Sequence, residues 1–332
     1  MNRVRVRAPG RVNLIGDHTD YTGGLVLPMA IDRWTVIEGV AADDVELVSD
    51  DEPEPARFSL PVVGLDRLRP RWGRYLAAVA AETEADHGVR GTVRTTIPIG
   101  AGLSSSAALE VSGALAFGYR GDRVALAEAC RRAEHRASGV PCGIMDQLVI
   151  ATAVESHAMM IDCRSLQMQR IVIPEDIEIV VEFVAHRTLA GSEYTDRVAQ
   201  CAAAERVIGP LRDATPSDLS SLDDPLVRKR ARHVITENER VMAFADALAS
   251  GDAAAAGALM VAGHRSLAAD FETSTPAMDA AVERMVATPG VFGARMTGGG
   301  FGGCVVALCR PGALRSGWTV RPVAGAQIEE DS

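Results

Sequence analysis

Residues 98–110 constrain the fold most, because a glycine-rich turn there joins a predicted strand at 91–97 to a helix with an apolar face. The turn reads Pro-Ile-Gly-Ala-Gly-Leu-Ser-Ser-Ser-Ala-Ala-Leu-Glu. Backbone N–H groups at such a turn face outward at the positive end of the helix dipole, which suits a phosphate group. The hydroxyls of Ser104, Ser105 and Ser106 can reach an anion or a metal ion. A plain helix cap is the alternative interpretation, since Ser and Gly are also common caps.

The motif is not one of the common nucleotide loops, and it sits within interleaved strands and helices. It lacks the Gly-Lys-Ser/Thr ending of a Walker A loop, and no protein-kinase motifs are present. The apolar pattern predicts strands at 4–7, 25–31, 34–40, 45–49, 91–97, 158–163, 168–173, 178–184, 291–297, 304–308 and 319–323. It predicts helices at 72–86, 105–118, 123–137, 194–207, 226–249, 253–271 and 276–287. A strand-rich first half and a mostly helical stretch from 190 to 290 indicate an α+β protein of two lobes.

A polar cluster, APGRVNLIGDHTDYTGG at 8–24, directly precedes the apolar strand at 25–31. The fold would hold these side chains at the edge of a core. Carboxylates accept hydrogen bonds from hydroxyls, and glycines let a ligand approach the backbone, so the cluster suits a small polyhydroxyl ligand. A polar hairpin loop is the alternative.

A third segment, Ala-Arg-Met-Thr-Gly-Gly-Gly-Phe-Gly-Gly-Cys at 294–304, places five glycines between two apolar strands. A hairpin needs only one or two glycines. The excess indicates a loop whose backbone passes close to the phosphate loop or to a ligand, with a wide glycine turn as the alternative.

Composition excludes several classes of function. The 332 residues carry 34 Lys+Arg against 44 Asp+Glu, a formal charge of −10, which argues against nonspecific attraction to nucleic acid or anionic membrane. No apolar run approaches the roughly 18 residues of a membrane span, and the start has no signal-peptide pattern. We expect a soluble, cytoplasmic protein that acts on small molecules, as a monomer or a small homo-oligomer. Six scattered cysteines indicate neither a disulfide framework nor a zinc site.

Together these segments resemble the galactokinases, a family of the GHMP kinase superfamily. PIGAGLSSSAA is similar to the superfamily's nucleotide loop, and GRVNLIGDHTDY to the galactokinase signature. CGIMDQ at 142–147, ARHVITENERV at 231–241 and ARMTGGGFGGC at 294–304 agree in the family's order. The resemblance implies the two-lobed GHMP kinase fold, with the active site in a cleft between the lobes. The N-terminal lobe, 1–165, would carry the sugar signature, the phosphate loop and the catalytic Asp; the helix-rich C-terminal lobe, 166–332, would carry the third motif.

The resemblance also implies ATP-dependent phosphorylation of a sugar at its anomeric hydroxyl, with galactose as the expected sugar. Asp146 matches the catalytic aspartate and Arg11 the arginine beside it. Asp146 would either take the hydroxyl proton or orient the hydroxyl until late in the transfer. Mg²⁺ would be held by Ser106 and Glu134 together with phosphate oxygens. The ATP phosphates would bind the loop residues Gly100, Ala101, Gly102, Leu103, Ser104, Ser105 and Ser106, with 299–302 packed beside them.

The sugar pocket implied by the resemblance falls mainly to the opening cluster. Its residues are Asp17, His18, Thr19, Asp20, Gly143 and Tyr194, whereas Asn13 and Tyr21 are expected to support the loop. Position 17 is Glu in the family, and Asp17 is one methylene shorter. The chain begins almost at its first strand, without the N-terminal segment typical of galactokinases, and 182–185 replace a polar pair. A kinase for a related hexose or pentose, and a sugar sensor without turnover, are therefore alternatives. The intact serine run argues against the sensor.

Overall fold

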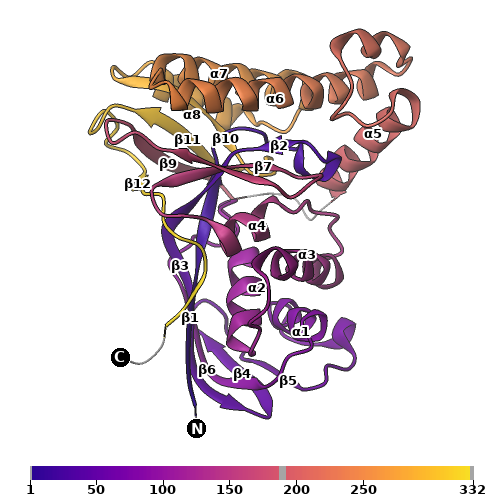
Figure 1. The fold of residues 1–332 in the computed structure, drawn as a ribbon, viewed down its shortest axis with the longest axis vertical. Coiled ribbons are helices and arrows are strands. Elements are labelled where there is room, and N and C mark those ends of the chain that lie inside the picture. The colour runs from indigo at the N-terminus through magenta and orange to yellow at the C-terminus, as the bar shows by residue number, and fades with distance from the viewer. Residues whose placement is uncertain (1, 187–191, 330–332) are drawn as a thin grey trace.

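The computed structural model describes residues 2–186 and 192–329. The strands of this part of the chain form three β-sheets. A six-stranded sheet has the order β13-β1-β3-β6-β4-β5, a four-stranded sheet the order β10-β11-β9-β12, and a three-stranded sheet the order β2-β7-β8. The strand pairs are antiparallel except β4 with β6. Figure 1 shows the six-stranded sheet in the lower half and the four-stranded sheet in the upper half.

The lower half is a sheet with helices packed on one face (Figure 1). Its strands are β1 (Arg3–Asn13), β3 (Pro28–Ala42), β4 (Asp44–Ser49), β5 (Ala56–Ser59), β6 (Gly88–Thr95) and β13 (Gln327–Ile328). Its helices are α1 (Gly73–Glu82), α2 (Ser105–Ala116), α3 (Arg123–Ser138) and α4 (Met145–Thr152). Because β1 lies inside the sheet, its last residues end deep in the molecule, where α2 and α4 pack against it.

The upper half places long helices over the four-stranded sheet (Figure 1). The strands of that sheet are β9 (Glu178–Ala185), β10 (Val291–Thr297), β11 (Gly303–Cys309) and β12 (Trp318–Val320). The three-stranded sheet has β2 (Leu25–Val26), β7 (His157–Asp162) and β8 (Met168–Val172). The helices are α5 (Ser192–Ile208), α6 (Pro225–Ala249), α7 (Ala253–Ser266) and α8 (Pro276–Val286). Short helical turns lie at Asp20–Thr22, Leu65–Arg67 and Pro216–Ser221, and a π-helical turn at Leu267–Phe271 follows α7.

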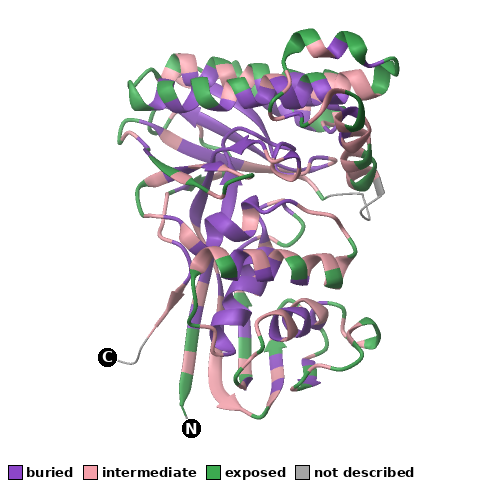
Figure 2. Ribbon diagram, turned by 45° about the vertical axis from the view of Figure 1, so that its right-hand side comes forward, coloured by how far each residue is buried: buried purple, intermediate pink, exposed green. Residues whose placement is uncertain are grey.

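Burial follows the contact faces of these elements. Figure 2 shows buried residues along α2, along the inner faces of α6 and α7, and in the sheets between them, with exposed residues on the outer helix faces. One apolar cluster runs from β1 and α1 to Val241 and Phe244 of α6. A second cluster lies around Leu211, Phe271 and Met278 in the upper half. The two halves therefore share one apolar core rather than meeting only at a hinge.

The mixed α+β, two-lobed architecture agrees with the prediction, but one pair of strands does not. Residues 25–31 and 34–40 were expected to be separate strands, whereas β3 runs without interruption from Pro28 to Ala42. The register of β1 against β3 shifts between Pro9 and Gly10, which pair with Trp34 and Ile31. Asp32 and Arg33, which resemble a turn in the sequence, therefore form a β-bulge within one continuous strand.

Other differences concern elements with weak local signals. Helix α4 was not predicted, because its N-cap residue Ile144 offers no side-chain cap and its eight residues are too few for a periodic pattern. The expected helix at 253–271 ends at Ser266 and continues as the π-helical turn. Strands β5 and β13 were missed because they are short. The alanine-rich run at 253–259 lies inside α7, as predicted.

The division of the chain at residue 165 remains a prediction. Residue 165 lies between β7 and β8, which pair with each other. Strand β13, near the end of the chain, pairs with β1 in the lower sheet, so the chain crosses between the halves more than once. Within residues 2–186 and 192–329, none of the helices combines the length and apolarity needed to cross a bilayer.

Candidate active site

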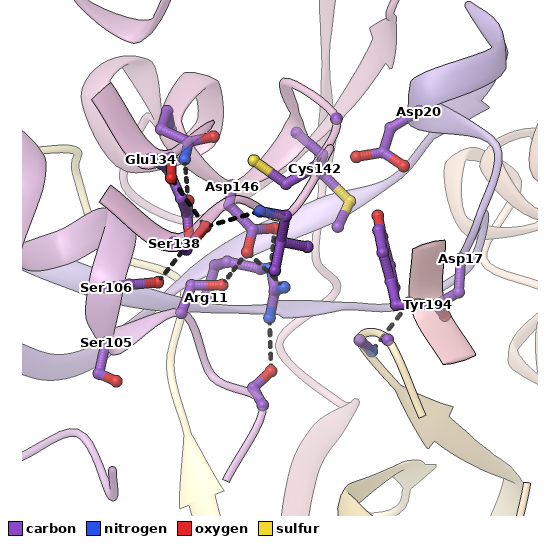
Figure 3. A pocket seen from close by; sticks show the side chains of 18 of the residues that line it. Arg11, Asp17, Asp20, Ser105, Ser106, Glu134, Ser138, Cys142, Asp146 and Tyr194 are labelled. Carbon is purple, nitrogen blue, oxygen red and sulfur yellow. Dashed lines mark hydrogen bonds and ion pairs between the residues drawn. The ribbon is translucent and has the colours of Figure 1, made fainter. Parts of the chain in front are cut away.

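A single pocket between the upper and lower halves brings the distant motifs together (Figure 3). Four segments form most of its wall: the end of β1 with the following loop, the 98–110 turn, the 138–147 segment, and the glycine-rich loop after β10. Tyr75, Glu134 and Tyr194 complete it. The lining residues are Arg11, Asp17, His18, Asp20, Tyr75, Gly100, Gly102, Ser104, Ser105, Ser106, Glu134, Ser138, Val140, Cys142, Gly143, Met145, Asp146, Gln147, Tyr194, Gly298, Gly299, Gly300 and Phe301.

Arg11 and Asp146 form the centre of this pocket. The guanidinium donates from Nε to Asp146 Oδ1 at 2.6 Å and from Nη2 to Oδ2 at 2.7 Å. Its Nη1 donates to the carbonyl of Gly102 at 2.7 Å. The Arg11 side chain is 5% exposed, whereas the Asp146 side chain keeps 27% of its surface open. A bidentate pair fixes the carboxylate in one orientation, and the open part of Asp146 faces the pocket.

The phosphate loop folds against this pair. The hydroxyl of Ser104 donates to Asp146 Oδ2, and Ser104 precedes α2 in the left-handed conformation, with φ 63°. Gly100, Gly102, Ser104, Ser105 and Ser106 line the pocket. The side chains of Ala101 and Leu103 are instead buried in the core, so these two predicted ATP contacts could be made only by backbone atoms. The loop thus alternates between anchoring residues and pocket-facing residues.

Ser106 and Glu134, the predicted magnesium ligands, lie side by side. The Ser106 hydroxyl donates to Glu134 Oε1 at 3.0 Å, and Gln147 Nε2 lies 2.5 Å from Glu134 Oε2. Burial, with the nearby negative charge of Asp146, raises the pKa of Glu134. Among the described residues, no group of three or more His, Cys, Asp or Glu side chains is arranged to hold a metal ion. Two oxygen ligands fit Mg²⁺ when phosphate oxygens and water complete the coordination.

Asp20 and Gly143 meet on the other side of the pocket. A Cβ atom at position 143 would lie 1.9 Å from Asp20 Oδ2, so only glycine leaves room for this carboxylate. Burial, with Asp146 close by, raises the pKa of Asp20 from 3.8 to about 7. Figure 3 shows Asp20 on the far side of the pocket from Ser105 and Ser106.

An aromatic group closes the same side. His18 Nδ1 lies 3.1 Å from the Tyr21 hydroxyl, and the His18 ring packs against Tyr194 and Phe271 with centroids 5.4 Å and 4.7 Å apart. Tyr21 supports the loop, as predicted. Thr19, predicted as a sugar contact, does not line the pocket: it is fully buried, with its hydroxyl 2.6 Å from the Leu25 carbonyl. Tyr194, also predicted as a sugar contact, does line the pocket.

Asp17 differs most from its expected role. Its Oδ2 accepts from Arg295 Nη2 and its Oδ1 from the backbone of Gly298, each at 2.8 Å. Arg295 also donates to Glu237 Oε1 at 2.8 Å, and all three side chains are buried. Asp17 lines the pocket, but both of its oxygens already have protein partners. Its shorter side chain therefore places the carboxylate within an ion-pair network that joins β10 and α6 to the sugar signature.

The glycine-rich loop after β10 lies beside the phosphate loop in the same pocket, as predicted from its excess of glycine. A Cβ atom at position 300 would lie 2.4 Å from the Thr273 carbonyl, and Gly300 has φ 73°. The neighbouring Phe301 N–H donates to the same carbonyl at 2.8 Å. Close backbone packing requires glycine here.

Four polar residues that the sequence analysis did not single out are buried at or behind the site. Glu237 and Arg295 lie within the recognised motifs, but nothing in their spacing indicated that they pair with Asp17. Glu110 and Gln147 are buried behind Glu134. A charged residue on the apolar face of a predicted helix, as at position 110, was the available signal.

The chain matches three family models. The model described as the galactokinase galactose-binding signature covers residues 2–39, the GHMP kinases N-terminal domain 72–153, and the GHMP kinases C-terminal model 244–317. The galactokinase of Homo sapiens is 42% identical, over 93% of this chain and 84% of the human protein. The galactokinase of Chloroflexus aurantiacus is 44% identical, over 91% and 83%.

Solved structures agree with these matches. Lactococcus lactis galactokinase complexed with galactose has a TM-score of 0.91 and 28% identity, over 98% of this chain and 95% of that chain. Mevalonate kinase of Methanococcus jannaschii has a TM-score of 0.72 and 18% identity, over 97% and 99%, and shows the shared fold alone.

The buried network predicts a large stability loss when Arg295, the cation that pairs with both Asp17 and Glu237, is removed. Arg295→Met removes the cation from the buried Asp17 and leaves Glu237 with Arg240, which should lower the free energy of unfolding by about 3–5 kcal/mol. Arg164→Met is the control, because Arg164 pairs with Asp213 at the surface and such pairs contribute less than about 1 kcal/mol. Urea unfolding of both variants measures the difference. Equal losses would contradict the importance of the network.

Proposed function

This chain belongs to the galactokinase family, and we propose that it transfers the γ-phosphoryl group of ATP to the anomeric hydroxyl of galactose. The observation that carries the proposal is the position of Asp146. It is held by Arg11 between the serine-rich turn on one side and Asp20 with His18 on the other. The products are ADP and galactose 1-phosphate.

The proposed reaction needs little covalent chemistry from the protein. The anomeric oxygen attacks the γ-phosphorus, a new O–P bond forms, and the bond from the γ-phosphorus to the β,γ-bridging oxygen breaks. Asp146 receives the hydroxyl proton, or orients it until the transfer is nearly complete. The anomeric hydroxyl is more acidic than an ordinary alcohol, so an ionised carboxylate is an adequate base.

The remaining residues bind and orient. Arg11 fixes Asp146 and places positive charge near the transferring group. Backbone groups of 100–106 would cradle the phosphates at the start of α2. Ser106 and Glu134 would hold Mg²⁺, which neutralises phosphate charge when bound. Asp20, His18, Gly143 and Tyr194 would contact the sugar. Asp17 would act mainly by anchoring the signature loop, because its oxygens are bonded to Arg295 and Gly298.

The direct test of this function is sugar-dependent ADP release across a panel of hexoses and pentoses at fixed ATP. We expect galactose to be the best substrate, with NMR placing the new phosphate on its anomeric carbon. If ADP were released only with another sugar, that sugar would replace galactose as the proposed substrate. No ADP release with any sugar, despite measurable sugar and ATP binding, would make the protein a sensor and contradict the proposed function.

Asp146→Asn should lower kcat by about 10²–10⁴-fold, because the amide cannot accept the proton. ATP affinity should stay near the wild-type value, since the phosphate loop keeps its other contacts. Asp176→Asn, an exposed carboxylate away from the pocket, is the matched control. Steady-state kinetics with nucleotide binding by calorimetry separate the two effects. A variant that kept most of its rate would show that Asp146 has a different role.

Asp20 should make sugar affinity depend on pH. Its raised pKa of about 7 means that the carboxyl is largely protonated at pH 6 and largely ionised at pH 8. The ionised form accepts stronger hydrogen bonds from sugar hydroxyls, so galactose affinity should rise several-fold between these pH values. The Asp20→Asn variant should bind galactose more weakly, and its affinity should no longer depend on pH in this range. Calorimetry without nucleotide measures it, and a flat wild-type profile would argue against Asp20 as the ligand that titrates.

A further inference from the structure

Behind Glu134 lies a buried pair of polar side chains that the proposed reaction does not use. Glu110 on α2 and Gln147 on α4 are both completely buried. Gln147 Nε2 donates to Glu110 Oε2 at 3.2 Å and to Glu134 Oε2 at 2.5 Å. An amide nitrogen carries two hydrogens, so Gln147 can serve one carboxylate with each. The opposite amide orientation would point a carbonyl oxygen at two carboxylates.

This arrangement holds Glu134 from two directions. Ser106 donates to Glu134 Oε1 at 3.0 Å, and Gln147 holds Oε2. Ser106 and Glu110 are four residues apart on α2 and therefore lie on the same face of this helix. That face supplies both the hydroxyl that donates to Glu134 and the carboxylate that accepts from Gln147. Gln147 also follows Asp146 directly, and the first turn of α4 therefore places both.

The donor to Glu134 is neutral, and this matters for its charge. An Arg or Lys in the place of Gln147 would neutralise Glu134 and compete with a cation, whereas an amide fixes the carboxylate and leaves its charge available.

The pair is also a poor device for stability. Glu110 Oε1 and Gln147 Oε1 are buried and have no hydrogen-bond partner in the part of the chain that the structure describes. Buried polar atoms without partners destabilise a fold, and apolar side chains of similar size would avoid that cost. The arrangement therefore calls for a reason other than stability.

We propose that Glu110 and Gln147 are positioning residues that hold the Glu134 carboxylate in the orientation needed for Mg²⁺ bound with ATP. The inference rests on the proposed function, in which Ser106 and Glu134 are the magnesium ligands. Partners of this kind commonly set the affinity of a metal site, because they orient the ligand.

The test measures ATP binding without sugar, by calorimetry, in Mg²⁺ and in EDTA. Gln147→Leu and Glu110→Leu should reduce the Mg²⁺-dependent gain in ATP affinity by about 10- to 100-fold, while binding in EDTA stays unchanged. Glu110→Gln should restore most of the gain lost in Glu110→Leu, because its carbonyl oxygen can still accept from Gln147. Ser112→Ala is the matched control, since this buried serine on α2 donates its hydroxyl hydrogen to the Leu109 carbonyl of its own helix.

The outcomes are distinct from those of the turnover assay, because no sugar is present. The inference would be overturned if Gln147→Leu showed the same Mg²⁺-dependent gain in ATP affinity as Ser112→Ala. It would also be overturned if the wild-type protein showed no such gain. If Gln147→Leu does not fold, Gln147→Asn withdraws the amide by one methylene and should give the same loss. Failure of Glu110→Gln to restore the gain would exclude Glu110 from the positioning role.

Discussion

The bidentate pair between Arg11 and Asp146 is the interaction on which the site depends. It joins the end of an interior strand to a short helix that is 135 residues further along the chain. The third arginine nitrogen holds the Gly102 carbonyl, and Ser104 donates to the same aspartate, so the phosphate loop is folded onto the pair. One guanidinium thereby sets the position of Asp146 relative to the serine-rich turn, and phosphoryl transfer requires reacting groups to be positioned in this way.

Charge explains the division of the pocket. Asp20, Glu134 and Asp146 all line it, and the pKa values of Asp20 and Glu134 are raised by burial and by Asp146. Carboxylates on the Asp20 side suit hydroxyl groups. Carboxylates on the Glu134 side suit a cation. ATP phosphates would bring further negative charge, which a metal ion, Arg11 and the backbone N–H groups at the start of α2 would offset. The second guanidinium, Arg295, is committed to Asp17 and Glu237 and serves to hold the sugar signature against α6.

Much of this could be predicted from the sequence, because the motifs themselves are local. The strand, glycine turn and helix around 91–116 follow from apolar spacing, and the excess of glycine at 298–303 correctly indicated close backbone packing. Long-range polar pairing could not be predicted in this way. Asp17 was expected to face the sugar, but burial of its carboxylate with Arg295 depends on where α6 and β10 pack. Helix α4, which carries Asp146, lacked both a cap and enough length to be recognised.

The most direct measurement is a structure of the protein with galactose, Mg²⁺ and a non-hydrolysable ATP analogue. The account predicts the anomeric oxygen within hydrogen-bond distance of Asp146 and in line with the γ-phosphorus, with Arg11 still bonded to the carboxylate. It also predicts the phosphates at residues 100–106. A sugar bound outside this pocket, or with its anomeric oxygen turned away from Asp146, would contradict it.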